Sequence, residues 1–495
     1  MLLFGDIHNH CAISYGYGSL ENALENGRSQ LDFCAVTGHA MWPDIPPRTE
    51  ETDFIVDFHE KGFAKLREHY SKTVQTVESH NEPGSFSTFI SYEMHGSKYG
   101  DHHIVSGDMS LPLLEASSPR ELYEMTREYK DTVIIPHHVA YAPGYRGISW
   151  ADYDESIMPV VEVCSKHGCS MSEQHPFAYY HTMGGRDGRN TVYHGLAIGK
   201  RFGFVGSTDH HAGYPGSYGD CALAVDARAN TRHDIIEAIK ARRCYAVTAD
   251  KIKCAFTVNG HSFGELVKGE SGKRRISLAA ELSDPLDKLV VYKNLKPIHV
   301  INGELLNVSG NSRLWKLRIE FGWGSPAGAY PWHFRVRSVG GSIVDVEKCF
   351  RGACVLSPVK GVEISEDVNR LGFYARLDSM GELEGYLSTV KNISTTSPST
   401  SALVLTVDGD ENTALMLEVN GRNICFCLRD VMCYGQTHPM GITNSETVYI
   451  HPCLPESLYN VRAELEDVED GPAFYHMEVF EKNGSMAFVS PVYFE

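Results

Sequence analysis

The first half of the chain alternates short apolar runs with amphipathic segments. Apolar runs of strand length lie at residues 2–7, 33–37, 88–92, 133–135, 160–163 and 202–206. Between the first two runs, Leu20, Ala23 and Leu24 have helical spacing behind Ser19, a residue type that favours a helix N-terminus. Strands that alternate with helices predict a parallel sheet or barrel, so we expect an α/β domain over residues 1–255.

The second half has a different pattern, in which apolar runs are short and turn residues separate them. These runs lie at residues 276–282, 288–292, 314–321 and 333–338. The pattern is typical of antiparallel strands with one buried face, and it predicts an all-β, sandwich-like region. We expect one β domain over residues 256–390, with 391–495 as a second β-rich domain or a continuation of the first.

Metal-ligating residue types follow five apolar runs in the first half. They are His8 with His10, His39, Glu93, His137 with His138, and Asp209 with His210 and His211. Each cluster alone has an ordinary structural explanation, such as a pair of surface histidines. In a parallel barrel all strands end at one face, so the five clusters would converge there and form a multinuclear metal site. Imidazole and carboxylate groups suit Zn, Mn or Fe, and a carboxylate such as Glu93 can bridge two ions.

Charge and cysteine content narrow the class of protein. The chain has 45 Lys and Arg against 63 Asp and Glu, a net charge of −18 that argues against nucleic-acid or anionic-membrane binding. The 13 cysteines are an odd number, and the first residues lack the basic and apolar segments of a secretion signal. We therefore expect reduced thiols, a cytoplasmic location and a small-molecule substrate. Association into a homo-oligomer is left open.

Five motifs resemble, in order and spacing, the polymerase and histidinol phosphatase (PHP) family of metal-dependent phosphoesterases. They are GDIHNH at residues 5–10, AVTGH at 35–39, YE at 92–93, IPHH at 135–138 and VGSTDHHAG at 205–213. The similarity covers about residues 1–265 and is greatest to an uncharacterised branch with a C-terminal β-rich extension. It implies a distorted (β/α)7 barrel, two or three divalent ions (Mn, Zn or Fe), and hydrolysis of a small phosphomonoester or phosphodiester by metal-activated hydroxide.

The resemblance also implies a ligand set. The implied ligands are His8, His10, Glu93 and Asp209 for the first ion, Glu93, His103 and His137 for the second, and His39 and His211 for the third. His102 competes with His103 in this set. We prefer His103 because it directly precedes an apolar pair.

Two positions depart from the family pattern near the third ion. The turn after the HxH segment, where the family often has an acid or a histidine, reads Ser14-Tyr15-Gly16. The family's Thr-Asp-His is here Thr37-Gly38-His39. Both changes remove an acid near the third ion. Three alternatives follow: the third ion is absent, its site is open, or Tyr15 acts there as a ligand or a substrate contact.

Further polar residues are expected at the same face. The candidate catalytic residues are Glu93, His138 and His210, and the candidate substrate contacts are Tyr15, Arg146, Lys166 and His167. Glu162, on a predicted strand, either orients a ligating histidine or pairs with a buried cation. The leading hypothesis is a phosphoesterase with a small phosphorylated substrate. The alternatives are a metal-dependent hydrolase of an amide, lactone or phosphonate ester, and a degenerate barrel whose β domains bind a partner.

Overall fold

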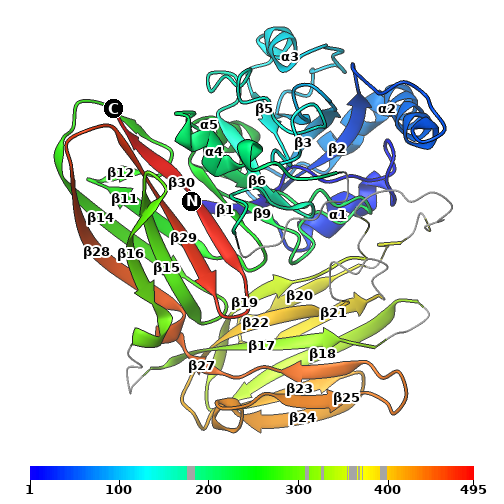
Figure 1. The fold of residues 1–495 in the computed structure, drawn as a ribbon. Helices are drawn as coiled ribbons and strands as arrows, with labels where there is room; N and C mark the ends of the chain where they lie inside the picture. The colour runs from blue at the N-terminus through cyan, green and yellow to red at the C-terminus, as the bar shows by residue number, and fades with distance from the viewer. Residues whose placement is uncertain are drawn as a thin grey trace.

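The structure is a computed structural model that describes residues 1–175, 184–306, 312–324, 328–353, 355, 365, 368–370, 372–390 and 399–495. An N-terminal α/β part lies beside two stacks of antiparallel sheets (Figure 1). The chain completes the α/β part, enters the first stack, passes through the second, and returns to the first at its C-terminus. The two ends of the chain therefore both belong to one continuous sheet.

The strands of the N-terminal part form a large mixed sheet and a small one. The large sheet has the order β10 (Cys244–Val247), β9 (Ala222–Asp226), β1 (Leu2–Asp6), β2 (Phe33–Met41), β3 (Ser87–Met94), β4 (His102–Ser106) and β5 (Thr132–Pro136). The small sheet has the order β7 (Gly168–Cys169), β6 (Val160–Ser165) and β8 (Gly203–Gly206). Pairs β1–β2, β2–β3 and β6–β8 are parallel, and the other pairs in this part are antiparallel.

The expected mixed α/β architecture is confirmed, whereas a closed (β/α)7 barrel is not shown by the described ladders. The small sheet contacts the large sheet at two places. Strand β6 is next to β5, and β8 is next to β9 and β10. No ladder of hydrogen bonds joins the two sheets among the described residues. The sheets therefore enclose a common interior without forming one continuous hydrogen-bonded cylinder.

Helices pack around the N-terminal sheets. They are α1 (Leu20–Arg28), α2 (Asp53–Ser79), α3 (Pro119–Thr126), α4 (Val192–Ala197) and α5 (Arg232–Lys240). Ser19 caps α1 as predicted, since its hydroxyl accepts a hydrogen bond from the amide of Asn22. The longest helix, α2, buries Val56, Phe63 and Leu66 on one face and packs against β2 and β3. No described helix is apolar over enough residues to cross a membrane, and the described cysteines are free thiols.

The site residues meet because the strand ends that carry them lie at the same edge of the large sheet. Strands β2 and β3 are parallel, and their register places His39 beside Glu93 near the end of each strand. Strand β4 is antiparallel to β3, so its first residues lie at this same edge, and His103 pairs with Glu93. A histidine at the start of an antiparallel strand is thus equivalent in position to one at the end of a parallel strand.

The first sandwich extends the N-terminal sheet. Its strands β13 (Leu266–Val267), β15 (Leu286–Lys293), β16 (Lys296–Asn302), β29 (Ala473–Glu481) and β30 (Met486–Phe494) continue the large sheet through the β30–β10 pair. The facing sheet contains β11 (Lys253–Val258), β12 (His261–Ser262), β14 (Gly272–Glu281) and β28 (Asn460–Glu469). One apolar core, which includes Phe256, Leu278 and Val479, lies between them.

The second sandwich occupies the sequence between the two halves of the first. One sheet contains β17 (Leu314–Gly322), β19 (Ser342–Cys349), β22 (Ser401–Asp408), β25 (Gln436–Pro439), β26 (Thr447–Ile450) and β27 (Leu454–Pro455). The other contains β18 (Tyr330–Val339), β20 (Tyr374–Leu377), β21 (Leu383–Thr389), β23 (Ala414–Val419) and β24 (Arg422–Cys427). The expected boundary at 390/391 falls between β21 and β22, which belong to the two sheets of this sandwich. The sheet pairing therefore gives no reason to divide the chain there.

Asp250 joins the three parts of the molecule. Its carboxylate is fully buried and accepts hydrogen bonds from Arg318 of the second sandwich, at 2.7 and 2.8 Å. It also accepts from Asn483 of the first sandwich at 2.6 Å and from the Tyr218 hydroxyl at 2.7 Å. Burial alone would raise the pKa of Asp250, but Arg318 and the other donors hold it well below its usual range. This carboxylate is therefore charged and links all three parts.

Substitution of Asp250 by Ala is expected to lower the free energy of unfolding by about 3–5 kcal/mol, because Arg318 would remain buried without its partner. Urea denaturation followed by fluorescence measures this change. The matched control is Asp408→Ala, which removes an exposed ion pair with Arg313 and should cost less than about 1 kcal/mol. Equal effects of the two substitutions would contradict the role assigned to Asp250.

Candidate metal centre

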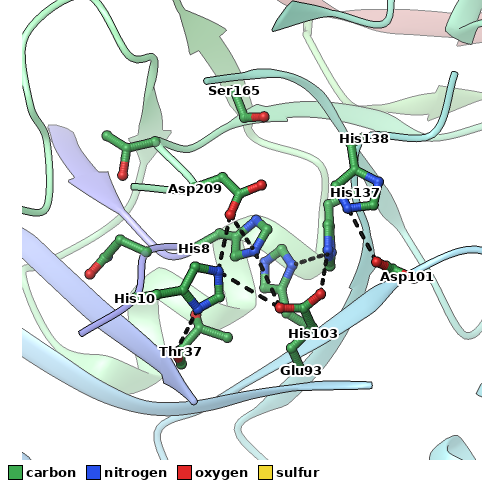
Figure 2. A network of polar contacts seen from close by, with 12 residues as sticks. His8, His10, Thr37, Glu93, Asp101, His103, His137, His138, Ser165 and Asp209 are labelled. Atoms are coloured by element: carbon green, nitrogen blue, oxygen red, sulfur yellow. Dashed lines mark hydrogen bonds and ion pairs between the residues drawn. The ribbon is translucent and has the colours of Figure 1, made fainter. Parts of the chain in front are cut away.

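The predicted ligand residues converge on one buried site, and Figure 2 shows His8, His10, Glu93, His103, His137 and Asp209 among them. Ligand atoms of three groups lie within 4.8 Å of one another inside each group, and the groups are His8 with His103 and His137, His10 with His39 and His211, and His8 with His10 and Asp209. All of these residues are buried. His103, and not His102, belongs to these groups, because neighbouring residues of a strand point to opposite faces. His102 instead lies 2.9 Å, through Nδ1, from the carbonyl oxygen of Gly100.

The carboxylate of Glu93 lies between two sets of imidazoles. Its Oε1 atom is 3.1 Å from His137 Nε2, whereas its Oε2 atom is 3.4 Å from His39 Nε2 and 3.7 Å from His10 Nε2. Burial alone would raise the pKa of Glu93, but His95, His137 and His39 hold it well below its ordinary value. The two oxygens therefore face different histidines, as a bridging carboxylate requires.

The carboxylate of Asp209, like that of Glu93, lies close to several histidines. Its Oδ1 atom is 3.0 Å from His10 Nε2 and 3.6 Å from His8 Nε2, and its Oδ2 atom is 3.0 Å from His167 Nε2. The backbone of Asp209 has φ = 50°, in the left-handed region. A non-glycine residue persists in that region only where its surroundings impose the conformation, which is common at functional sites. Here the amide of Asp209 donates to the carbonyl of His8 at 2.7 Å.

The histidines are oriented from outside so that their Nε2 atoms point inward. His10 Nδ1 lies 2.9 Å from the carbonyl oxygen of Thr37, and His211 Nδ1 lies 3.1 Å from that of Asp209. His8 Nδ1 lies 2.9 Å from Glu162 Oε2. Outer partners of this kind fix the ring orientation of metal-ligating histidines. Of the two roles considered for Glu162, the contact with His8 matches the orienting one.

These residues fit divalent metal ions. The Nε2 atoms of His8 and His103 are buried and have no hydrogen-bond partner among the described residues, and a buried polar atom without a partner is costly. Burial lowers the pKa of His8, His39, His103 and His211 well below the ordinary value. Neutral imidazoles keep the lone pair that binds a metal, so ions at this site would satisfy the orphan atoms.

The two departures from the family pattern have a structural explanation. A Cβ atom at position 38 would lie 2.7 Å from the Cδ atoms of Leu66, so any side chain there would require the Leu66 side chain of α2 to move. The ring of Tyr15 stacks on His39, with 3.4 Å between centroids, and its hydroxyl lies 3.0 Å from His95 Nε2. Tyr15 therefore contacts a predicted ligand through its ring, while its hydroxyl reaches a histidine that is outside the predicted set.

A cavity of about 580 Å³ opens on the ligand residues. Among the candidate catalytic and substrate-binding residues, the cavity is lined by Glu93, His138, Tyr15, Arg146 and His167. His138 Nε2 lies 3.2 Å from Asp101, Arg146 also forms an ion pair with Asp101, and the Tyr141 hydroxyl lies 3.0 Å from His167 Nδ1. The backbones of His138 and Arg146 are left-handed, with φ = 31° and 66°.

Two candidates lie behind the site instead of lining the cavity. Lys166 is buried and forms an ion pair with Asp220 at 2.6 Å, so its ammonium group is directed away from the ligands. His210 accepts a hydrogen bond from the amide of Ala212, and burial and the nearby Lys166 lower its pKa to about 3. The three residues Asp209, His210 and His211 lie in a loop after β8, in which the outer two face the site and the middle one does not.

The sequence interpretation missed His95 and Asp101. His95 Nδ1 lies 2.9 Å from Glu93 Oε1 and 3.1 Å from Asp101 Oδ2. His95 follows Glu93 by two residues, the spacing that places two side chains on one face of an extended strand. That spacing is the same signal that identifies His8 and His10, and it was available in the sequence.

The second sandwich supports the loop that carries Asp209 and His211. The amide of His211 donates to the carbonyl of Val355 at 3.0 Å, and the Asn369 side chain donates to the carbonyl of Ala212 at 2.7 Å. Asn369 is buried, and its Oδ1 atom accepts from the amide of Ala353 at 2.8 Å. The β-rich part therefore contributes backbone contacts that position metal-ligand residues.

Glu162→Gln is expected to weaken metal affinity about 10–100-fold, because the substitution alters the group that orients His8. Competition with a chromophoric chelator measures this affinity. The control Glu124→Gln changes an exposed carboxylate on α3 and should leave the affinity unchanged. Unaltered affinity in Glu162→Gln would show that the contact does not support the ligand.

Comparison with known proteins gives distant similarities. No family model matches the chain. An uncharacterised protein of Chlamydia pneumoniae is 26% identical over 255 residues, which cover 47% of this chain and 39% of that protein. One of Chlamydia muridarum is 23% identical over 287 residues, which cover 53% and 42%. The matched region thus spans about two fifths of these relatives' length.

Two solved structures are similar over large parts of the chain. One is a two-domain protein of Bacteroides vulgatus that contains a predicted PHP-like metal-dependent phosphoesterase, with 14% identity, coverage of 86% of this chain and 94% of that one, and a TM-score of 0.32. The other is the lesion-specific endonuclease PfuEndoQ of Pyrococcus furiosus, with 15% identity, coverage of 48% and 56%, and a TM-score of 0.28. At these TM-scores neither similarity establishes a shared fold.

Proposed function

We propose that the chain is a multinuclear metal-dependent hydrolase whose substrate is a small phosphomonoester or phosphodiester. The observation that supports this most directly is the convergence of buried, inward-facing imidazoles around the carboxylates of Glu93 and Asp209. A buried cluster of this composition is expensive to assemble without ions to bind its lone pairs. An open cavity beside it gives a small molecule access.

The proposed ion sites divide the residues of the three groups so that His8 and His10 serve the first ion alone. His8, His10 and Asp209 would hold one ion, His103 and His137 a second, and His39 and His211 a third, with Glu93 between them. Bound divalent ions would supply Lewis acidity, which activates water and offsets negative charge on the reacting group. The retained ligand set is the reason to prefer an active enzyme over a degenerate barrel.

We propose that His138 transfers a proton at the leaving group. Its Nε2 atom lies 3.2 Å from Asp101, and its Nδ1 atom has no hydrogen-bond partner among the described residues. Asp101 thus fixes the ring of a residue that lines the cavity, and the buried Nδ1 atom has no other group to bind in the described part of the chain. Proton transfer at Nδ1 would assist departure of the alcohol. His167, held between Asp209 and Tyr141, would position the substrate beside it.

Arg146 is the one Lys or Arg side chain among the described residues that line the cavity. Its guanidinium lies 4.0 Å from Glu93 Oε1, close enough to the ligands to contact a phosphoryl oxygen. Its ion pair with Asp101 offsets part of its charge. This pairing favours, as the second candidate, a less charged substrate such as a lactone, an amide or a phosphonate ester.

His8→Ala is expected to lose bound metal and to lower kcat/KM by more than about 100-fold. Substitution of a residue that only orients a metal ligand already lowers metal affinity or activity by about 10–100-fold, and loss of the ligand itself should cost more. Metal content by plasma mass spectrometry and a panel of phosphoesters, lactones and amides measure both effects. His233→Ala, at an exposed histidine, is the matched control and should behave as wild type. A fully active, metal-loaded His8→Ala enzyme would refute the proposal, and turnover of carboxyl substrates alone would favour the second candidate.

A further inference from the structure

One side of the cavity is apolar, although its other side carries the ligand residues. The apolar wall consists of Trp42, Pro46, Phe54, Ile55, Phe58 and Tyr145. Two of these side chains are strongly exposed, Ile55 at 43% and Tyr145 at 55%. Large apolar side chains that share one exposed concave surface mark binding sites more often than scattered ones do.

Folding does not account for the apolar wall. Helix α2 already buries one face, with Val56, Phe63 and Leu66 against the sheet, and one apolar face is all that a surface helix needs. Phe54 and Ile55, in the first turn of the same helix, line the cavity instead of packing on the sheet. Exposure of these apolar side chains to water is unfavourable, so a ligand that covers them would bind more tightly.

Aromatic rings connect the wall with the ligand residues. The Phe54 and Phe58 ring centroids are 6.1 Å apart, Phe58 lies 4.7 Å from Tyr15, and Tyr15 stacks on His39 at 3.4 Å. On the other side, the Arg146 guanidinium lies over the Trp42 ring at 5.2 Å. A molecule with its reacting group at Glu93 would therefore place its remaining part among flat apolar surfaces.

We propose that the substrate is an ester whose non-reacting part is an apolar ring system, that is, an aryl phosphate or a close relative. This inference rests on the proposed function. A sugar phosphate would leave several hydroxyl groups against apolar side chains, which is costly. A polynucleotide would require a row of cations along its backbone, and Arg146 is the one such residue among the described lining residues. The cavity, at about 580 Å³, accommodates one to two fused rings and a phosphate.

The test compares 2-naphthyl phosphate with phenyl phosphate, which share the reacting group and differ in apolar area. The metal-loaded wild-type enzyme is expected to show a KM for the naphthyl ester lower by roughly 5- to 20-fold, with similar kcat, because extra buried apolar carbons strengthen binding. Ile55→Asp should abolish this preference, because a charged group would then lie in the apolar wall, whereas Ile55→Leu should retain it.

The matched control is Ile198→Asp, which makes the same change at an isoleucine of similar exposure, 50%, outside the cavity lining. Calorimetric binding of the corresponding naphthyl and phenyl phosphonates gives a readout that needs no turnover. Equal KM and Kd for the two ring sizes, or equal loss of preference in both aspartate variants, would overturn the inference while leaving phosphoesterase activity intact. Absence of both hydrolysis and phosphonate binding would instead refute the proposed function, and the inference with it.

Discussion

The carboxylate of Glu93, buried among imidazoles at one edge of the N-terminal sheet, is the feature on which the site depends. Register places it beside His39 on one strand and beside His103 on the other. Its two oxygens face separate sets of histidines. A buried carboxylate is favourable only when compensated, so the histidines and Glu93 have to be assembled together, and the fold of the surrounding strands has to hold them in place.

The β-rich parts help to keep that site buried and ordered. The loop with Asp209 and His211 accepts a hydrogen bond from Asn369 and donates one to the carbonyl of Val355, and both residues belong to the sequence between β19 and β20. Asp250, through Arg318 and Asn483, binds both sandwiches to the N-terminal part. The second sandwich thus acts on the site through contacts with the backbone of the ligand loop. In the part of the chain that the structure describes, the sandwiches contribute no ligand atom to the three groups described above.

Prediction from the sequence was most complete where a residue of a metal-ligating type directly follows an apolar run. His8, His10, His39 and His137 were identified in this way, because the end of a buried strand is where a polar side chain reaches a shared edge. His95 was missed because it does not directly follow the apolar run at residues 88–92 but lies two residues beyond Glu93. Lys166 and His210 were expected at the cavity, but a residue's neighbours along the chain do not determine which way its side chain points in a loop.

The sequence by itself therefore determined the residue types of the centre, the α/β character of the first half and the β-rich character of the second, because periodicity and ligand chemistry are local properties. Only the tertiary structure decided the antiparallel direction of β4 that brings His103 to Glu93, the return of β29 and β30 to the N-terminal sheet, and the apolar wall that the start of α2 forms with residues of two loops. These features depend on pairings between distant segments, whose energies no local pattern records.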